Sequence, residues 1–270
     1  MFLSNIHIYP VKSTRRISLA EARVEFLGLE GDRRWMVVDA AHRFLTQREA
    51  PRLALVQAWR VELRLMLAAP GMNLLSVPLP GATAHRLTVN VWRDSVMASP
   101  AGDAADQWFT SFLGRPCQLV YMDNPRARLA NPDYAAPGSV VSFADGFPLL
   151  VTSTGSLAAL NRLMSKPVPM HRFRPNVVIA GSEAFAEDNW HRIQIGGVCF
   201  QVAKPCTRCI ITTTSQDTAV RGKEPLRTLS TFRKRGSNVY FGENLVPETP
   251  GTIRVGDEVS VLEWRPHPKP

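Results

Sequence analysis

The chain has no long hydrophobic run and only four cysteines. No stretch is long and apolar enough to span a bilayer. The N-terminus alternates apolar and polar residues and then reaches Pro10, so it has no basic start followed by an apolar core and is not a signal peptide. Because only Cys206 and Cys209 are close together, the cysteines do not form a disulfide framework. These absences predict a soluble cytoplasmic protein in a reducing compartment, with no membrane attachment.

Internal repeats, low-complexity segments and known nucleic-acid-binding signatures are also missing. The charge is nevertheless basic, with 32 Lys and Arg against 23 Asp and Glu and a net charge of +9. This balance is typical of an arginine-rich solvated surface, or of a protein whose partner carries phosphate or another negative charge. A nucleic-acid-binding β-barrel is therefore one alternative function. It would bind DNA or RNA with a steep salt dependence and would hold no metal.

Short apolar or alternating segments, separated by Gly and Pro, predict an α+β protein that is mainly β. The spacing is typical of a barrel or sandwich rather than of βαβ units. A boundary near 118–122 divides the chain into 1–120 and 121–265, followed by a frayed tail at 266–270. A loop over 124–139 is expected to be mobile or folded over a pocket. The strands are expected at 2–9, 22–27, 35–38, 59–67, 73–77, 87–92, 117–122, 148–152, 177–180, 192–196, 198–204, 238–241 and 254–264, and the helices at 101–113, 157–164 and 223–235.

The stretch Pro205-Cys206-Thr207-Arg208-Cys209 places two thiols behind a proline, with an arginine between them. The β-branched run at 210–214 predicts a strand, in which alternate side chains point to opposite faces. A cysteine at the mouth of such a strand is held at a fixed angle, as a metal ligand must be. Arg208 adds a permanent positive charge, which favours thiolate over thiol and can bind an anion.

The cysteine pair could also have other roles. The residues disfavour a structural zinc site, which needs four Cys or His ligands, usually as two close pairs, whereas Cys117 and Cys199 stand alone. A thioredoxin-type pair normally begins a helix, whereas 210–214 predicts a strand. From the residues alone, two interpretations stay open: a cofactor ligand, or two thiols packed as small hydrophobic groups.

Several loops carry groups that bind anions. Short loops near the N-terminus present Lys12, Arg33 and Arg48. The turn Ser153-Thr154-Gly155-Ser156 leads into the helix expected at 157–164, where it is either a plain N-cap or a set of free N–H groups for an anion.

Two ordered sets of short motifs run along the chain. The first set is Tyr9-Pro10-Val11-Lys12-Ser13, Gly31-Asp32-Arg33-Arg34-Trp35, Thr46-Gln47-Arg48 and Val91-Trp92-Arg93-Asp94, and the second is Phe173-Arg174-Pro175-Asn176, Pro205-Cys206-Thr207-Arg208-Cys209 and Gly251-Thr252-Ile253-Arg254-Val255-Gly256-Asp257. The first set resembles the N-terminal β-barrel domain, and the second the MOSC domain, of the MOSC family, named for the C-terminus of molybdenum cofactor sulfurase. The resemblance covers nearly the whole chain and implies a β-barrel MOSC domain behind an N-terminal β-rich domain, with a few peripheral helices. The family members that this chain resembles are the amidoxime-reducing components and their bacterial counterparts.

The resemblance implies a molybdenum atom on a pterin dithiolene (molybdopterin), bound by Cys209, with Cys206 as a neighbour. A soft thiolate suits a metal that sulfur already binds. The phosphate and pterin of this cofactor need cations and amide-type partners. The resemblance assigns that role to Lys12, Ser13, Arg33, Arg174, Asn176, Thr207 and Arg208, with Arg48, Ser153, Thr154 and Ser156 as additions.

The resemblance also implies reduction of small N-hydroxylated substrates, in which the oxygen of N–OH leaves as water and two electrons are returned by a partner. The proton donor stays open between Asp32, the 124–139 loop and a bound water. Neither the membrane-anchoring leader of the mitochondrial members nor the C-terminal ferredoxin domain of many bacterial relatives is expected here. The electrons should then come from a separate ferredoxin- or flavodoxin-like protein, which a basic surface could receive if it is acidic. A carrier of the cofactor, or of its sulfur, is the main alternative function.

Overall fold

The computed structural model describes residues 1–81 and 86–266; residues 267–270 of the expected tail lie outside this range. The strands are β1 (Phe2–Ile8), β2 (Ile17–Leu19), β3 (Glu21–Glu25), β4 (Gly28–Leu29), β5 (Trp35–Asp39), β6 (Gln57–Val61), β7 (Arg64–Ala68), β8 (Leu75–Pro78), β9 (Leu87–Val91), β10 (Asp94–Pro100), β11 (Cys117–Tyr121), β12 (Leu149–Ser153), β13 (Val177–Ala180), β14 (Trp190–Ile195), β15 (Val198–Thr207), β16 (Lys234–Arg235), β17 (Asn238–Pro247), β18 (Gly251–Arg254) and β19 (Val259–Trp264). The α-helices are α1 (Asp103–Leu113), α2 (Thr154–Arg162) and α3 (Leu226–Phe232), and the 3₁₀ helices are Pro51–Leu55, Met170–Arg172, Ala186–Asn189 and Ile210–Thr213. None of the described helices has both the length and the apolar character needed to cross a membrane.

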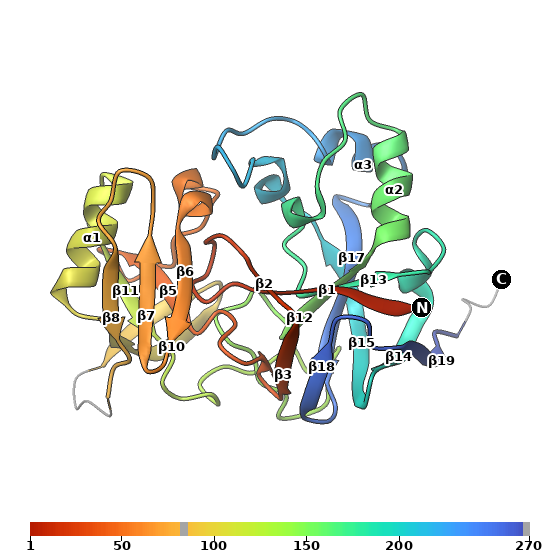
Figure 1. Cartoon of the computed structure of the whole chain (residues 1–270), viewed down its shortest axis with the longest axis horizontal. Coiled ribbons are helices and arrows are strands. Elements are labelled where there is room, and N and C mark those ends of the chain that lie inside the picture. Colours follow the sequence, from red (N-terminus) through yellow and green to blue (C-terminus); the bar gives the residue numbers. More distant parts are fainter. Residues whose placement is uncertain (82–85, 267–270) are drawn as a thin grey trace.

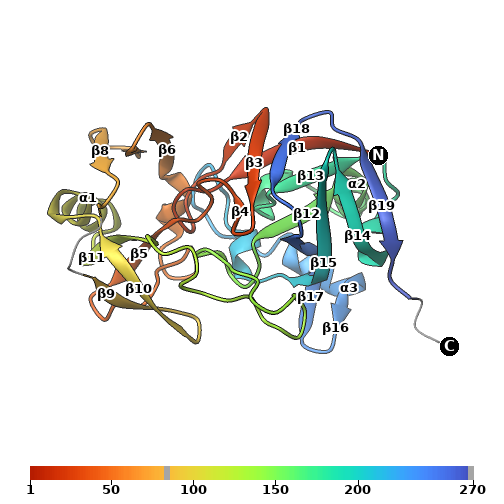
Figure 2. The same cartoon turned by 90° about the horizontal axis from the view of Figure 1, so that it is seen from below.

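The strands gather into two lobes that lie side by side (Figure 1). One lobe contains a large sheet of order β19-β14-β15-β17-β12-β13-β1-β2, with β16 added to β17, and a small sheet β18-β3-β4. The other lobe contains the sheets β5-β11-β10-β9 and β6-β7-β8. Helices α2 and α3 lie on the first lobe and α1 on the second (Figures 1 and 2). The expected mainly β fold with a few peripheral helices is confirmed.

Each lobe has its own apolar core. The large sheet buries a cluster that includes Trp190 and Phe200. In the other lobe α1 contributes Trp108, Phe109 and Phe112, all buried, as the sequence predicted. Gly114 ends α1 with a φ of 69°, a conformation that glycine adopts without steric cost.

The first strands of the chain belong to the lobe that the C-terminal half builds. β1 pairs antiparallel with β13, and β3 pairs antiparallel with β18. In Figure 2 the red N-terminal strands accordingly run beside the green and blue ones. The predicted boundary near residue 120 therefore does not separate the two lobes, because strands from before residue 120 pair with strands from after it. After β4 the chain passes from this lobe to the other lobe, where β5 begins. The loops near this passage contribute to the site described below.

The strand predicted at 210–214 is wrong, because residues Ile210–Thr213 form a 3₁₀ helix. Thr212 Oγ1 donates a hydrogen bond to the Cys209 carbonyl over 3.0 Å, and Thr213 Oγ1 donates one to the Ile210 carbonyl over 2.8 Å. Hydroxyl groups that bond to a nearby backbone in this way compete with sheet formation. Cys209 consequently ends an extended segment instead of beginning one.

Candidate functional site

A cavity lies where segments of the two lobes meet. Its walls come from the loops after β1 and β4, from the segment before β12, from residues before β13, and from the end of β15. Most of the predicted site residues meet here although they are far apart in the sequence. Those that line the cavity are Lys12, Ser13, Arg33, Arg174, Asn176, Thr207, Arg208 and Cys209.

Three of these residues have left-handed backbone conformations, with φ of 70° for Ser13, 48° for Arg33 and 57° for Arg174. Such values are unusual for residues other than glycine and cost free energy, so they persist only where the surrounding structure imposes them. The Arg33 N–H donates to the Tyr9 carbonyl over 2.8 Å, which fixes one of the three turns. Strained backbone gathered at one cavity indicates a functional site.

Lys12 is almost completely buried and places an ammonium group in the cavity wall. Its Nζ donates to Asp145 Oδ1 over 2.6 Å and to the Phe143 carbonyl over 2.7 Å. Burial lowers the pKa of Lys12 to about 8, although the Asp145 carboxylate opposes this effect. Partial desolvation raises the pKa of Asp145, but the Lys12 ammonium outweighs that and holds this pKa below its usual range. The pair is therefore ionised at neutral pH.

Tyr9 lies against two guanidinium groups. The Cζ atoms of Arg33 and Arg174 are 4.3 Å and 4.1 Å from its ring centroid. Arg33 also donates to Asn176 Oδ1 over 2.7 Å and pairs with the buried Asp32 carboxylate at 2.5 Å. Burial lowers the pKa of Arg174 to about 10. The aromatic ring and the amide thus hold two cations side by side.

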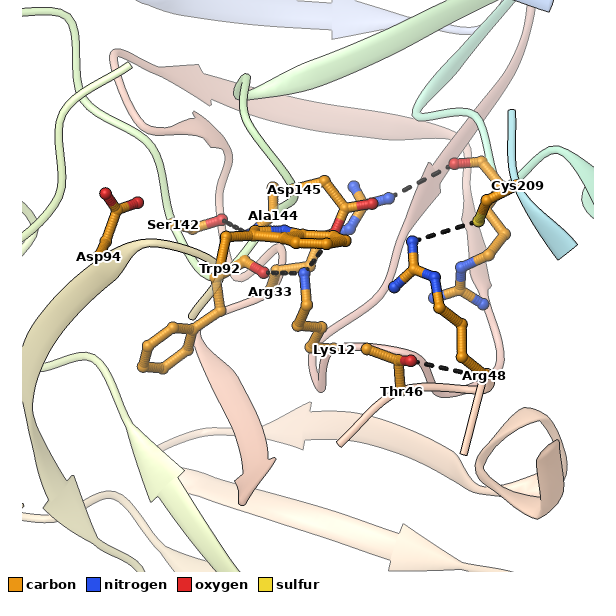
Figure 3. A network of polar contacts seen from close by, with 12 residues as sticks. Lys12, Arg33, Thr46, Arg48, Trp92, Asp94, Ser142, Ala144, Asp145 and Cys209 are labelled. Atoms are coloured by element: carbon orange, nitrogen blue, oxygen red, sulfur yellow. Dashed lines mark hydrogen bonds and ion pairs between the residues drawn. The ribbon is translucent and has the colours of Figure 1, made fainter. Parts of the chain in front are cut away.

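Both cysteines of the motif have an arginine as their neighbour, and Figure 3 shows the contact between Cys209 and Arg48. An Arg48 terminal nitrogen lies 3.2 Å from Cys209 Sγ. An Arg208 terminal nitrogen lies 2.9 Å from Cys206 Sγ. Burial raises the pKa of Cys206, and Arg208 opposes that rise. Each thiol therefore has its own cation, and Arg48 comes from the other lobe.

The Ser153–Ser156 turn lies away from the cavity. Ser153 caps α2, as predicted, because its Oγ accepts from the Ser156 N–H over 3.0 Å. The acceptor at this cap is a side chain of the protein itself: Ser153 Oγ and Ser156 Oγ donate to the buried Glu187 carboxyl group over 3.0 Å and 2.6 Å. Neither these serines nor Thr154 lines the cavity. We correct their assignment accordingly and leave them out of the proposed site.

Sequence reasoning missed several residues of the site. Asp145 and Thr46 line the cavity, and Tyr9 supports its cations. Gln47 and Gln216 exchange side-chain hydrogen bonds of 2.9 Å and 2.8 Å across the lobes. Tyr9, Thr46 and Gln47 belong to motifs quoted above, so their place in those motifs was a signal. Asp145 and Gln216 had none.

The alternative proton donors differ in their access to the cavity. Asp32 is buried, accepts from the Tyr9 N–H over 2.8 Å and pairs with Arg33, and it does not line the cavity. The segment that follows the 124–139 loop does line it, through residues 144–147. Water stays an open alternative.

The donor set fits an anionic cofactor that brings its own metal ligands. Lys12, Arg33, Arg174 and Arg208 line the cavity against one carboxylate, Asp145. The Arg208 Nε is buried and has no hydrogen-bond partner. Among residues 1–81 and 86–266, no group of three or more His, Cys, Asp or Glu could bind a metal ion. Cys209 could supply one thiolate ligand, so the other ligands must arrive with the metal.

Comparison with known proteins identifies the class. Residues 1–116 match the MOSC N-terminal beta barrel domain, and residues 138–260 match the MOSC domain. The chain belongs to the MOSC family. Its relatives include mitochondrial amidoxime-reducing component 1 of Homo sapiens, 35% identical over 96% of this chain and 82% of the relative, and mitochondrial amidoxime reducing component 2 of Bos taurus, 36% identical over 95% and 82%. Among solved structures, the YUAD protein from Bacillus subtilis aligns at 12% identity over 95% of this chain and 92% of that chain, with a TM-score of 0.44.

The cytoplasmic location expected from the sequence is contradicted by this comparison. The two relatives named above, and mitochondrial amidoxime reducing component 2 of Homo sapiens, are named as mitochondrial components. The earlier expectation rested on the absence of a signal peptide and of a long apolar run, and neither absence distinguishes the cytoplasm from an organelle.

Proposed function

We propose that the protein is a molybdenum-cofactor-dependent reductase of N-hydroxylated compounds that receives its electrons from a separate protein. The observation that carries the proposal is the convergence of eight predicted residues, from segments far apart in the sequence, on one cavity that holds the Cys209 thiol. The names of the relatives, amidoxime-reducing components, support the substrate class.

The residues divide into a metal ligand, anion-binding groups and supports. Cys209 would bind the metal through its thiolate. Lys12, Arg33, Arg174 and Arg208 would bind the phosphate and the polar edge of the pterin, since guanidinium groups form paired bonds with phosphate. Asn176 acts behind them: its amide accepts from Arg33 and from the Leu150 N–H, and donates to the His7 carbonyl over 3.1 Å. We therefore assign Asn176 to positioning Arg33.

The bound cofactor would supply the metal and its two-electron oxygen-transfer chemistry. The protein supplies the rest. The end of β15 fixes the thiol, and the cation-rich cavity neutralises the anionic group. Arg48 and Trp92 do not line the cavity, but Arg48 contacts the Cys209 thiol and lies over the Trp92 ring, so a substrate that reaches this thiol would meet both side chains.

The test compares the two cysteines, which lie three residues apart. Cys209→Ala should lose bound molybdenum, measured by elemental analysis of protein from a cofactor-producing host, and should lose reduction of benzamidoxime with an artificial electron donor. Cys206→Ala should keep the metal and stay within about tenfold of the wild-type rate, because a neighbouring group tunes a metal without binding it. Equal losses in both variants would contradict the ligand assignment. Bound molybdenum without multiple turnovers in the wild type would favour the carrier function.

A further inference from the structure

Arg48 connects the Cys209 thiol to the face of an exposed indole. Its guanidinium nitrogen is 3.2 Å from Cys209 Sγ, and its Cζ is 4.7 Å from the Trp92 ring centroid. Figure 3 shows the two side chains near the Lys12–Asp145 pair. A flat, delocalised C–N cation therefore already occupies the space between the indole and the sulfur.

Trp92 is held in this place by its surroundings. The side chain is 47% exposed, although large aromatic residues are usually much more buried. Its backbone is left-handed, with a φ of 57°, and its ring contacts Phe44 at a centroid distance of 5.0 Å. The indole Nε1 donates to Asp145 Oδ1 over 3.3 Å. The exposed ring is thus fixed in strained backbone at the border of the site, as functional residues often are.

Asp145 adds a negative charge beside this ring. Its Oδ1 accepts from both Lys12 and Trp92, while its Oδ2 has no hydrogen-bond partner among the described residues. The side chain is 64% exposed. An aromatic face and a neighbouring carboxylate are the two groups that recognise a planar nitrogen cation, through the ring quadrupole and through charge-assisted hydrogen bonds.

We propose that Trp92 and Asp145 form a subsite for planar amidine-type groups, and that the Arg48 guanidinium occupies this subsite until a ligand displaces it. A guanidinium and a protonated amidine are both flat cations whose charge is delocalised over carbon and nitrogen. The two groups would therefore compete for the same face of the Trp92 ring. The proposal deepens the proposed function, because an amidine is the product of amidoxime reduction. Its binding test is independent of catalysis, since it needs neither metal nor turnover.

The probe is benzamidine, and the neutral benzamide of nearly the same shape is its control. Binding to metal-free, full-length protein is measured by isothermal titration calorimetry. Wild type should bind benzamidine and bind benzamide at least about tenfold more weakly, because only the cation gains from the ring and the carboxylate. Trp92→Leu should weaken benzamidine binding by about fivefold, whereas Trp92→Phe should keep most of it.

The direction in which Arg48→Ala changes the benzamidine affinity is the decisive result. Removing an internal competitor should tighten benzamidine binding by about fivefold, and this gain should disappear in the Arg48→Ala, Trp92→Leu double variant. A gain from charge removal alone would persist in the double variant. Arg52 is a matched control because its guanidinium also lies on an aromatic ring, 4.4 Å from Phe112, and it does not line the cavity. Arg52→Ala should leave the affinity unchanged.

Two results would overturn the proposal. One is equal binding of benzamidine and benzamide by wild type. The other is an affinity gain in Arg48→Ala that survives the loss of the Trp92 ring. Failure of the proposed function would look different, as a protein that binds benzamidine in this way and yet neither holds molybdenum nor reduces benzamidoxime.

Discussion

Lys12 and Asp145 form an ion pair of unequal partners, since the Lys12 side chain is 5% exposed and the Asp145 side chain 64%. In the unfolded chain Lys12 has its ordinary pKa, while burial lowers the folded-state pKa to about 8. Between these values the unfolded state binds more protons, so the lysine's contribution makes stability rise with pH above about 8. Below that pH Lys12 is charged, and the Asp145 carboxylate stabilises this buried charge.

Asp145→Asn should therefore destabilise the protein most where Lys12 is charged. We expect a loss of about 1–2 kcal/mol at pH 7, less than for a fully buried pair because the carboxylate is largely exposed. The loss should shrink as the pH rises from 8 to 10, where Lys12 becomes neutral. Urea unfolding across this pH range measures it.

Asp94→Asn is the matched control for this prediction. Asp94 pairs with Arg128 at 2.5 Å. As in the Asp145–Lys12 pair, the carboxylate is largely exposed (45%) and the cation is buried (5% exposed). Arginine stays charged throughout this pH range, so the cost of Asp94→Asn should be flat with pH. Equal slopes for the two variants would show that Lys12 does not titrate as described.

At the residue scale, the sequence identified the chemistry of the site better than its geometry. The motifs supplied Lys12, Arg33, Arg174 and Cys209, which line one cavity. They did not predict the left-handed backbone at three positions, because no glycine marked it. Nor did they predict that Glu187 would occupy the Ser153 cap, since a carboxylate distant in sequence leaves no local pattern.

At the element scale, the loop predicted over 124–139 is fastened by one arginine. Arg128 is 5% exposed. Its guanidinium donates to the Ser142, Ala144 and Asp145 carbonyls and to the Asp94 carboxylate. The segment held in this way carries Asp145 and the cavity residues that follow it. Part of the loop also packs on the protein, because Ala130 and Ala135 belong to a buried cluster with Phe147.

Replacing this arginine should loosen the cavity wall. Arg128→Gln removes a buried guanidinium that satisfies three carbonyl groups, so we expect a loss of about 2–4 kcal/mol and faster amide hydrogen exchange over residues 142–147. Arg126→Gln, an exposed arginine of the same loop, should change neither quantity. Unchanged exchange at 142–147 in Arg128→Gln would mean that other contacts order the segment.

The elements also show where local sequence reasoning works. α1 was predictable because its apolar face repeats at helical spacing and a glycine ends it. The 210–214 run was misassigned because β-branched residues favour strands, yet the Thr212 and Thr213 hydroxyls are also able to bond to the backbone and did so here. Propensity alone does not decide between these two outcomes.

At the scale of the whole molecule, much of the positive charge serves internal bonding. Many arginines donate to backbone carbonyls: Arg34, Arg128, Arg172, Arg174, Arg208, Arg221 and Arg265. These arginines keep their charge, but the N–H groups bonded to carbonyls are not free for direct contacts with a nucleic acid or an acidic electron carrier. The number of these charges is known from the sequence. Their contacts could not be predicted from it, since their partners lie far along the chain.

Because β1–β4 complete the sheets of the C-terminal lobe, we expect that the C-terminal half of the chain does not fold on its own. Residues 121–265 alone lack β1, which lies between β13 and β2, and lose the buried Leu3, Ile6, Val24 and Leu29. Burial of four such side chains contributes roughly 6–12 kcal/mol, comparable with the whole stability of a domain. The fragment 121–265 should show no cooperative thermal transition by circular dichroism. Joining residues 1–30 to its N-terminus through a flexible linker should restore one, because β1–β4 then refill the sheet edge. A cooperative transition of 121–265 by itself would mean that the C-terminal sheet folds without the strands that also bring Lys12 and Ser13 to the cavity.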